Sequence, residues 1–142
     1  MNFSDQRTFP ARMAMLAETA AFVEAFCNRA AVARDDALRL TLIVEELFTN
    51  TIAHGHRGDS DAPVDIRLLR DAGDIEIVFE DRAPAHDPTE RLRTPPSSLG
   101  ATLDERPVGG LGLQLVAGLA ASFRYAREQE RNRLQLVLKC RS

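Results

Sequence analysis

Two polar side chains near the middle of this chain stand four residues apart, in the segment Val44-Glu45-Glu46-Leu47-Phe48-Thr49-Asn50. On a helix, that spacing places Glu46 and Asn50 on the same edge. The carboxamide oxygen of Asn50 suits a hard cation such as Mg²⁺, which leaves its remaining coordination to phosphates and water. The carboxylate of Glu46 could then accept the proton of an attacking hydroxyl group or water. Taken alone, the pair is more typical of a solvated helix edge.

A third carboxylate ends an apolar strand further along the chain. Asp81 falls on the same side of a two-residue period as Ile75, Ile77 and Phe79, so its side chain should point into the core. An inward carboxylate without a donor is costly, and the exocyclic amine of adenine would be a suitable donor. Backbone amides at the strand end would serve as well, and that arrangement is about as common. Asp81 is therefore a candidate for binding a purine base or for a structural role.

Glycines provide the next signal, in the segment Gly109-Gly110-Leu111-Gly112, which opens an apolar helix. Glycines let backbone amides approach phosphate oxygens, and the amino end of a helix favours negative charge. This match is weak alone, and it is not the P-loop, because no Lys-Ser or Lys-Thr pair follows the glycines. The order of the signals is acid and amide, inward carboxylate, then glycine loop, and together they predict an ATP site.

The hydropathy pattern predicts the elements that hold these residues. In chain order they are a strand over 1–9, helices over 11–31 and 36–54, a hairpin over 63–79, a helix over 109–121 and a hairpin over 123–138. Asp35 or Asp36 is the predicted cap of the second helix. This order predicts an α/β sandwich, with a mixed, mostly antiparallel sheet and helices on one face.

The segment from Arg82 to Val108 has no sustained periodicity and is rich in proline. A long irregular segment in a compact domain is typically a functional lid or disordered. We predict a single domain over residues 1–142, with an ATP lid over about 82–109.

The composition is that of an ordinary globular domain. The chain has 142 residues, of which 44% are hydrophobic and 27% charged, enough for a full core. A formal charge of −3 provides no basic field, so nucleic acid is a poor candidate for a direct partner. Cys27 and Cys140 are too few for a disulfide framework or a metal set. The sequence shows no signal peptide and no apolar run of membrane length, so we expect a cytoplasmic protein without membrane contact.

The conjunction of these segments resembles the GHKL ATPase family, whose nucleotide-binding domain has the Bergerat ATP-binding fold. Residues 46–55 resemble its N box, residues 80–88 its G1 box and residues 109–113 its G2 box, and the resemblance covers nearly the whole chain. One departure is Ala83, where the G1 box usually has glycine.

The resemblance also implies roles for individual residues. Glu46 would be the general base, Asn50 would coordinate Mg²⁺, and Asp81 would bind the adenine amine. The glycines that would let the lid close on the phosphates are Gly109, Gly110 and Gly112.

Within that family, the chain is most similar to anti-sigma-factor serine kinases of the RsbW type. This resemblance implies a serine/threonine-protein kinase that uses ATP and Mg²⁺, phosphorylates an anti-anti-sigma factor and sequesters a sigma factor in a partner-switching pathway. It is also compatible with a homodimer.

Three other functions remain open at this point. A histidine kinase core would need a phosphoacceptor histidine on a dimerisation helix, and the histidines of this chain, His54, His56 and His86, all lie outside the first helix. A non-catalytic switch of the same fold would bind nucleotide or only protein. A scaffold with decayed boxes is the least favoured, because Glu46 and Asn50 are intact.

Overall fold

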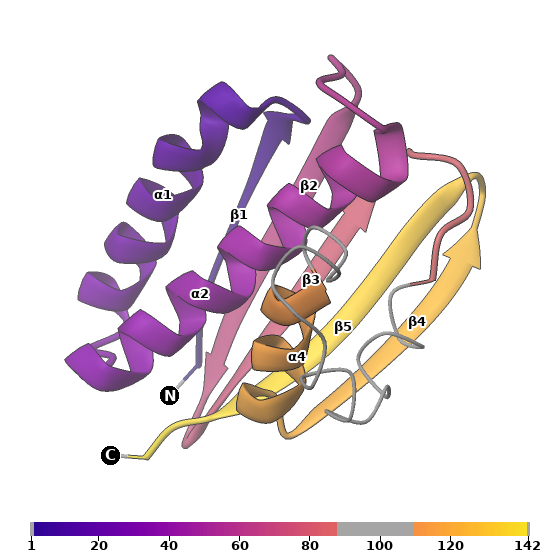
Figure 1. Cartoon of the computed structure of the whole chain (residues 1–142). Coiled ribbons are helices and arrows are strands. Elements are labelled where there is room, and N and C mark those ends of the chain that lie inside the picture. The colour runs from indigo at the N-terminus through magenta and orange to yellow at the C-terminus, as the bar shows by residue number, and fades with distance from the viewer. Residues whose placement is uncertain (1, 88–109, 142) are drawn as a thin grey trace.

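The computed structural model describes residues 2–87 and 110–141, and these residues form one five-stranded sheet covered by helices. Its strands follow the order β1-β2-β3-β5-β4, and each neighbouring pair is antiparallel (Figure 1). The strands are β1 (Asn2–Pro10), β2 (Pro63–Asp71), β3 (Asp74–Asp81), β4 (Ser122–Glu128) and β5 (Arg131–Lys139). The predicted α/β sandwich is confirmed, and the sheet of the described residues is antiparallel rather than mixed.

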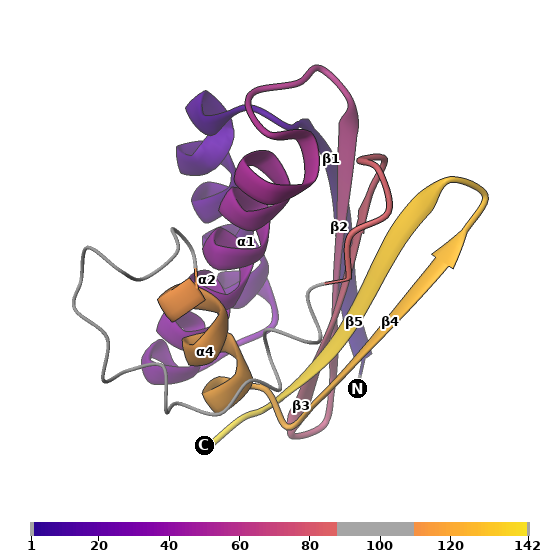
Figure 2. The ribbon, with the colours of Figure 1, turned by 45° about the vertical axis from the view of Figure 1, so that its right-hand side comes forward.

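Helices cover one face of this sheet (Figure 2). They are α1 (Leu16–Arg29), α2 (Arg34–Asn50) and α4 (Gly110–Leu119), with a 3-10 turn, η1 (Met13–Met15), before α1 and a π-helical stretch, η2 (Thr51–His56), after α2. The central helix, α2, packs against both α1 and α4. No helix among the described residues is long and apolar enough to cross a membrane.

Both hairpins form where the alternating pattern predicts them. Asp71 pairs with Asp74 across the first turn, and Glu128 pairs with Arg131 across the second. The two residues of the second turn, Gln129 and Glu130, have φ values of 50° and 61°. Positive φ at both positions matches the twist of the flanking strands, which sets the register of β4 against β5.

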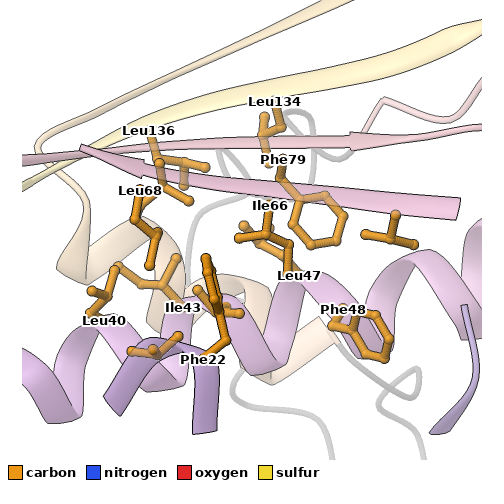
Figure 3. Packing of buried hydrophobic residues seen from close by; sticks show 14 of the residues in the cluster. Phe22, Leu40, Ile43, Leu47, Phe48, Ile66, Leu68, Phe79, Leu134 and Leu136 are labelled. Carbon is orange, nitrogen blue, oxygen red and sulfur yellow. The ribbon is translucent and has the colours of Figure 1, made fainter. Parts of the chain in front are cut away.

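The hydrophobic core fills the space between the helices and the sheet (Figure 3). Leu40, Ile43 and Leu47 of α2 face Ile66 and Leu68 of β2 in this layer. The same two-residue alternation that predicts the strands places their apolar side chains on the covered face. The core thereby fixes α2 over the middle of the sheet.

The start of α2 differs from the prediction. Its N-cap is Ala33, without a side-chain hydrogen bond, and Asp36 lies in the first turn, fully buried. The Asp36 carboxylate accepts hydrogen bonds from the Arg39 guanidinium and, at 3.1 and 3.2 Å, from the backbone N–H of Arg141. The predicted cap is wrong because this carboxylate binds the segment that follows β5 instead.

The end of α2 also departs from a simple helix. The α-helical hydrogen bonding stops at Asn50, and residues 51–56 continue in π-helical form. Arg57 then adopts a left-handed conformation with φ of 60°, and the Gly58 N–H donates to the Ile52 carbonyl at 2.8 Å. Such π-helical turns often occur at functional sites.

Candidate functional site

The carboxylate of Asp81 lies at the end of β3 and points into the protein, as the strand period predicts. Only 3% of the residue is exposed. One oxygen, Oδ1, accepts from the Ala83 N–H at 3.0 Å and from Asn132 Nδ2 at 2.9 Å. The other, Oδ2, accepts from the Thr51 hydroxyl at 2.5 Å and pairs with His86 Nε2 at 3.1 Å. Four donors from three parts of the chain therefore meet at one buried carboxylate.

This environment lowers the pKa of Asp81. Burial alone would raise the pKa, because it disfavours the charged form. Hydrogen bonds from His86, Asn132 and Thr51 outweigh burial, so the pKa lies below its usual value. Asp81 is therefore an ionised acceptor at neutral pH.

Asn132 on β5 holds the carboxylate in place. It lies opposite Asp81 in the β3–β5 register and is 4% exposed. Besides Asp81, its Nδ2 donates to the carbonyls of Ala83 and Pro84 at 3.0 and 3.2 Å. Its Oδ1 accepts from the Tyr125 hydroxyl at 2.5 Å and from Arg127 at 3.0 Å. Asn132 thus joins the β4–β5 hairpin to the segment that follows β3.

Asn50 and Asp81 line a common cavity, although they come from different elements. Asn50 is the last residue of α2 and is 5% exposed. The cavity has a volume of about 20 Å³, room for about one water molecule. Its lining comprises Leu47, Asn50, Thr51, Phe79, Asp81, His86, Tyr125, Asn132 and Leu134. The lining thus combines the polar side chains of Asn50, Thr51, Asp81, His86, Tyr125 and Asn132 with apolar ones.

Glu46 lies one helical turn before Asn50 but is not among the residues that line this cavity. It is half-buried. Burial raises the pKa of Glu46, and the neighbouring charge of Glu45 raises it further. A carboxylate with a raised pKa is better matched to proton transfer near neutral pH than an exposed one.

Gly55 of η2 makes room for the segment after β3. A Cβ added at Gly55 would lie 2.9 Å from the Ala83 Cβ and 2.9 Å from His86 Nε2. Real Cβ atoms almost never come so close, so the backbone of η2 can approach Ala83 only because residue 55 has no side chain. The methyl group of Ala83 is fully buried against this glycine.

The glycine segment is described in part. Gly110 begins α4 and Gly112 lies in its first turn, as predicted, whereas Gly109 and most of the predicted lid, residues 88–109, lie outside the described residues. Leu113 and Val116 of α4 are fully buried. These contacts fix α4 against α2, the helix of Glu46 and Asn50.

No group of three or more His, Cys, Asp or Glu side chains suitable for a metal ion occurs in the described residues. A Mg²⁺ ion at Asn50 would therefore take one protein oxygen and complete its shell with phosphates and water. Mg²⁺ commonly binds in this way beside nucleotides. The carboxamide oxygen of Asn50 thus fits a Mg²⁺ ion that a nucleotide also binds.

Sequence reasoning missed four polar residues that line the site: Thr51, His86, Tyr125 and Asn132. Thr51 begins η2, where the helix changes from α-helical to π-helical form, so an α-helical period does not predict its position. Asn132 could have been found only with the β3–β5 register, because it lies opposite Asp81 there. The sequence around His86 gives no signal that its ring reaches back five residues.

Comparisons with known proteins place this geometry in context. A profile of the family described as histidine kinase-like ATPase domain matches residues 9–138. A serine/threonine-protein kinase, BtrW from Bordetella bronchiseptica, is 29% identical over 98 residues, which are 69% of this chain and 67% of BtrW.

Two solved structures share the fold at 13% identity, which relates the folds alone. The first, the RsbU and RsbW domains of a protein from Mycobacterium tuberculosis, has a TM-score of 0.67 and covers 97% of this chain. This chain spans only 32% of that longer one. The second, the SiaB–SiaC complex from Pseudomonas aeruginosa, has a TM-score of 0.68 and covers 94% of this chain and 88% of the other.

Proposed function

Since the chain belongs to the histidine kinase-like ATPase domain family, we propose that it is an ATP-dependent serine/threonine-protein kinase and anti-sigma factor. Its substrate would be a small anti-anti-sigma protein, and its second partner a sigma factor. One observation carries the proposal: Asn50 of α2 and Asp81 of β3 line a single cavity. The name of the relative BtrW, a serine/threonine-protein kinase, supports the choice of acceptor residue.

Nucleotide binding would use Asp81 for the base and Asn50 for the metal ion that accompanies the phosphates. The ionised carboxylate of Asp81 would accept a hydrogen bond from the adenine amine. The amide oxygen of Asn50 would hold a Mg²⁺ ion, which supplies charge neutralisation between the phosphates. Gly110 and Gly112, with Gly109 before them, would offer backbone N–H groups to the phosphates at the start of α4. Glu46 lies one helical turn before Asn50 on α2, where it would face the acceptor side of such a complex.

Glu46 would act as the general base for the transfer. Its carboxylate takes the proton of the acceptor hydroxyl as the new oxygen–phosphorus bond forms and the bond to the ADP oxygen breaks. Such transfers depend on positioning and charge neutralisation more than on covalent chemistry by the protein. The new phosphate adds about two negative charges to the acceptor protein, which changes the surface it offers to this chain.

Calorimetric titration with ATP and Mg²⁺ tests the binding half of the proposal. We expect saturable binding by the unaltered protein and loss of binding in Asp81→Ala. Asn50→Ala should weaken binding only when Mg²⁺ is present, because its role is through the ion. Asp74→Ala, an exposed position on the same strand as Asp81, is the matched control and should bind normally. Absence of saturable binding by the unaltered protein would refute the nucleotide site.

Transfer of labelled γ-phosphate tests the chemical half, with small anti-anti-sigma proteins of the source organism as acceptors. Glu46→Gln should bind ATP as the unaltered protein does and lose at least about a hundredfold in transfer rate, the usual contribution of a general base. The control is Glu24→Gln, a change of equal charge at an exposed position of α1, which should transfer phosphate normally. Equal transfer by Glu46→Gln and the unaltered protein would remove Glu46 from this role.

A specific observation also favours the alternative, a non-catalytic nucleotide- or protein-binding switch of the same fold. Asp81 is saturated by donors of the chain itself, and the cavity beside it holds about one water molecule. A switch that binds protein alone would show no saturable ATP binding. A switch that binds nucleotide would bind ATP and transfer no phosphate to any acceptor.

A further inference from the structure

His86 occupies one of the acceptor positions of Asp81, the carboxylate that the proposed function assigns to the adenine amine. An ionised carboxylate has about four lone-pair sites on its two oxygens. Here each oxygen already accepts two donors, Ala83 N–H and Asn132 on one and Thr51 and His86 on the other. A further donor can bind Asp81 well only if one of these four leaves.

Three of the four donors are fixed in place. The Ala83 N–H belongs to the backbone, and Thr51 lies within η2 and is 1% exposed. Asn132 is held by Tyr125 and Arg127 as well as by Asp81. Asn132 cannot turn away without breaking its bonds to Tyr125 and Arg127, and Thr51 has almost no exposed surface.

The His86 ring differs from the other three donors in its exposure and in the length of its bond, although the His86 backbone N–H donates to Asn132 Oδ1 at 3.4 Å. It lies on an irregular segment after β3, and its side chain is 18% exposed. Its hydrogen bond to Asp81 is the longest of the four, at 3.1 Å. The ring therefore has a route to solvent that the other donors lack.

The His86 ring lies at the cavity that the proposed function assigns to the purine base. Nε2 sits against Gly55, within 2.9 Å of where a Cβ would be, and the ring lines the cavity between Asn50 and Asp81. With the ring in place, the cavity of about 20 Å³ is far too small for a bicyclic base. Like an aminopurine, the imidazole is planar and offers an N–H to the carboxylate at its edge.

We propose that His86 is an internal competitor of the purine base, so that an adenine nucleotide binds Asp81 only as the His86 ring leaves it. This inference rests on the proposed nucleotide site and adds the residue that sets its affinity. The apparent affinity of a site falls by the fraction of molecules in which the site is open. If the ring occupies Asp81 in about nine molecules of ten, removing it tightens nucleotide binding about tenfold.

The test is titration of the full chain with ADP and Mg²⁺, because ADP reports binding without transfer. His86→Ala should bind ADP about tenfold more tightly than the unaltered protein. His86→Phe keeps a planar ring but has no N–H donor, so it should also bind more tightly, by a smaller factor. Ala85→Ser, an exposed change on the same segment, should leave the affinity unchanged.

Nuclear magnetic resonance of the histidine ring nitrogens gives a second readout. The His86 Nε2 resonance should report a hydrogen bond in the free protein and lose it when ADP saturates the site. A ring signal that ADP leaves unchanged would overturn the competition.

The two proposals fail in different ways. Equal or weaker ADP binding by His86→Ala, with binding lost in Asp81→Ala, would overturn the competitor and leave the purine site standing. Absence of saturable ADP binding in every variant would overturn the nucleotide site and the competitor together.

Discussion

Asn132→Asp is a nearly isosteric change that places two carboxylates in contact inside the protein. In the unaltered protein, Asn132 Nδ2 donates to Asp81 Oδ1 at 2.9 Å. The substitution replaces that donor with an acceptor, and two carboxylates so close cannot both be ionised. The folded protein must therefore hold a shared proton that the unfolded chain, with a carboxyl pKa of about 4, has released at neutral pH.

The cost follows from the pH at which that proton is held. Keeping one proton bound costs about 1.4 kcal/mol for each pH unit above the unfolded pKa. Between pH 4 and pH 7, about three units, Asn132→Asp should therefore lose about 4 kcal/mol of unfolding free energy relative to the unaltered protein. The folded pKa of the pair is raised, so the stability present at low pH is lost as the pH rises.

The unaltered protein should show the opposite slope at this site. The pKa of Asp81 is lowered by its hydrogen bonds, so the stability it contributes is complete above about pH 4 and is lost as the pH falls further. Urea denaturation at pH 2, 3, 4, 5, 6 and 7 measures both trends. Gln135→Glu is the matched control, because Gln135 lies on the same strand and bonds Arg124 at 2.8 Å at the surface. Parallel pH trends for Asn132→Asp and the unaltered protein would refute the account of this network.

Two further predictions concern other parts of the fold. The acid limb of the pH–rate profile for phosphotransfer should lie above the ordinary glutamate pKa of about 4.3, because burial and Glu45 raise the pKa of Glu46. Glu45→Gln should move this limb to lower pH. A limb that stays in place would exclude an effect of the Glu45 charge on the pKa of Glu46. Asp36→Ala should lower the unfolding free energy in urea by about 3 kcal/mol, because it removes the buried carboxylate that pairs with the half-buried Arg39 and accepts from the Arg141 N–H. The exposed neighbour Asp35→Ala should cost less than about 1 kcal/mol, and equal losses would show that the Asp36 contacts add nothing.

Local pattern was sufficient for most of the fold. Alternation in β2 and β3 and the apolar faces of the helices carried the prediction, because burial on one face imposes a period on the sequence. The resemblance read from the three boxes is confirmed by the family profile over residues 9–138. Asn50 and Asp81 meet at one cavity, and the roles assigned to them remain predictions.

Contacts between residues far apart in the chain could not be predicted from the sequence. The failed cap at Asp36 shows this, because its partner Arg141 is 105 residues away. Asn132 enters the site through the β3–β5 register, which no local pattern encodes. The π-helical form of η2 is a tertiary effect too, since Gly55 and Thr51 fit against Ala83 and Asp81 there.

The change from α-helical to π-helical form after Asn50 constrains the length of η2 as well as its residue types. A π-helix bonds each residue to one five positions away, so it holds more residues per turn than an α-helix. Deleting one residue within 51–56 would restore α-helical geometry. Gly55 would then rotate away from its close contact with Ala83. The connection at 57–62 is largely exposed, but it is bound to the segment after β1: the Ser60 N–H donates to the Ala11 carbonyl at 2.9 Å, and the Ala11 N–H donates to the Ala62 carbonyl at 3.0 Å. Length variation among related chains should therefore be rare within residues 51–56.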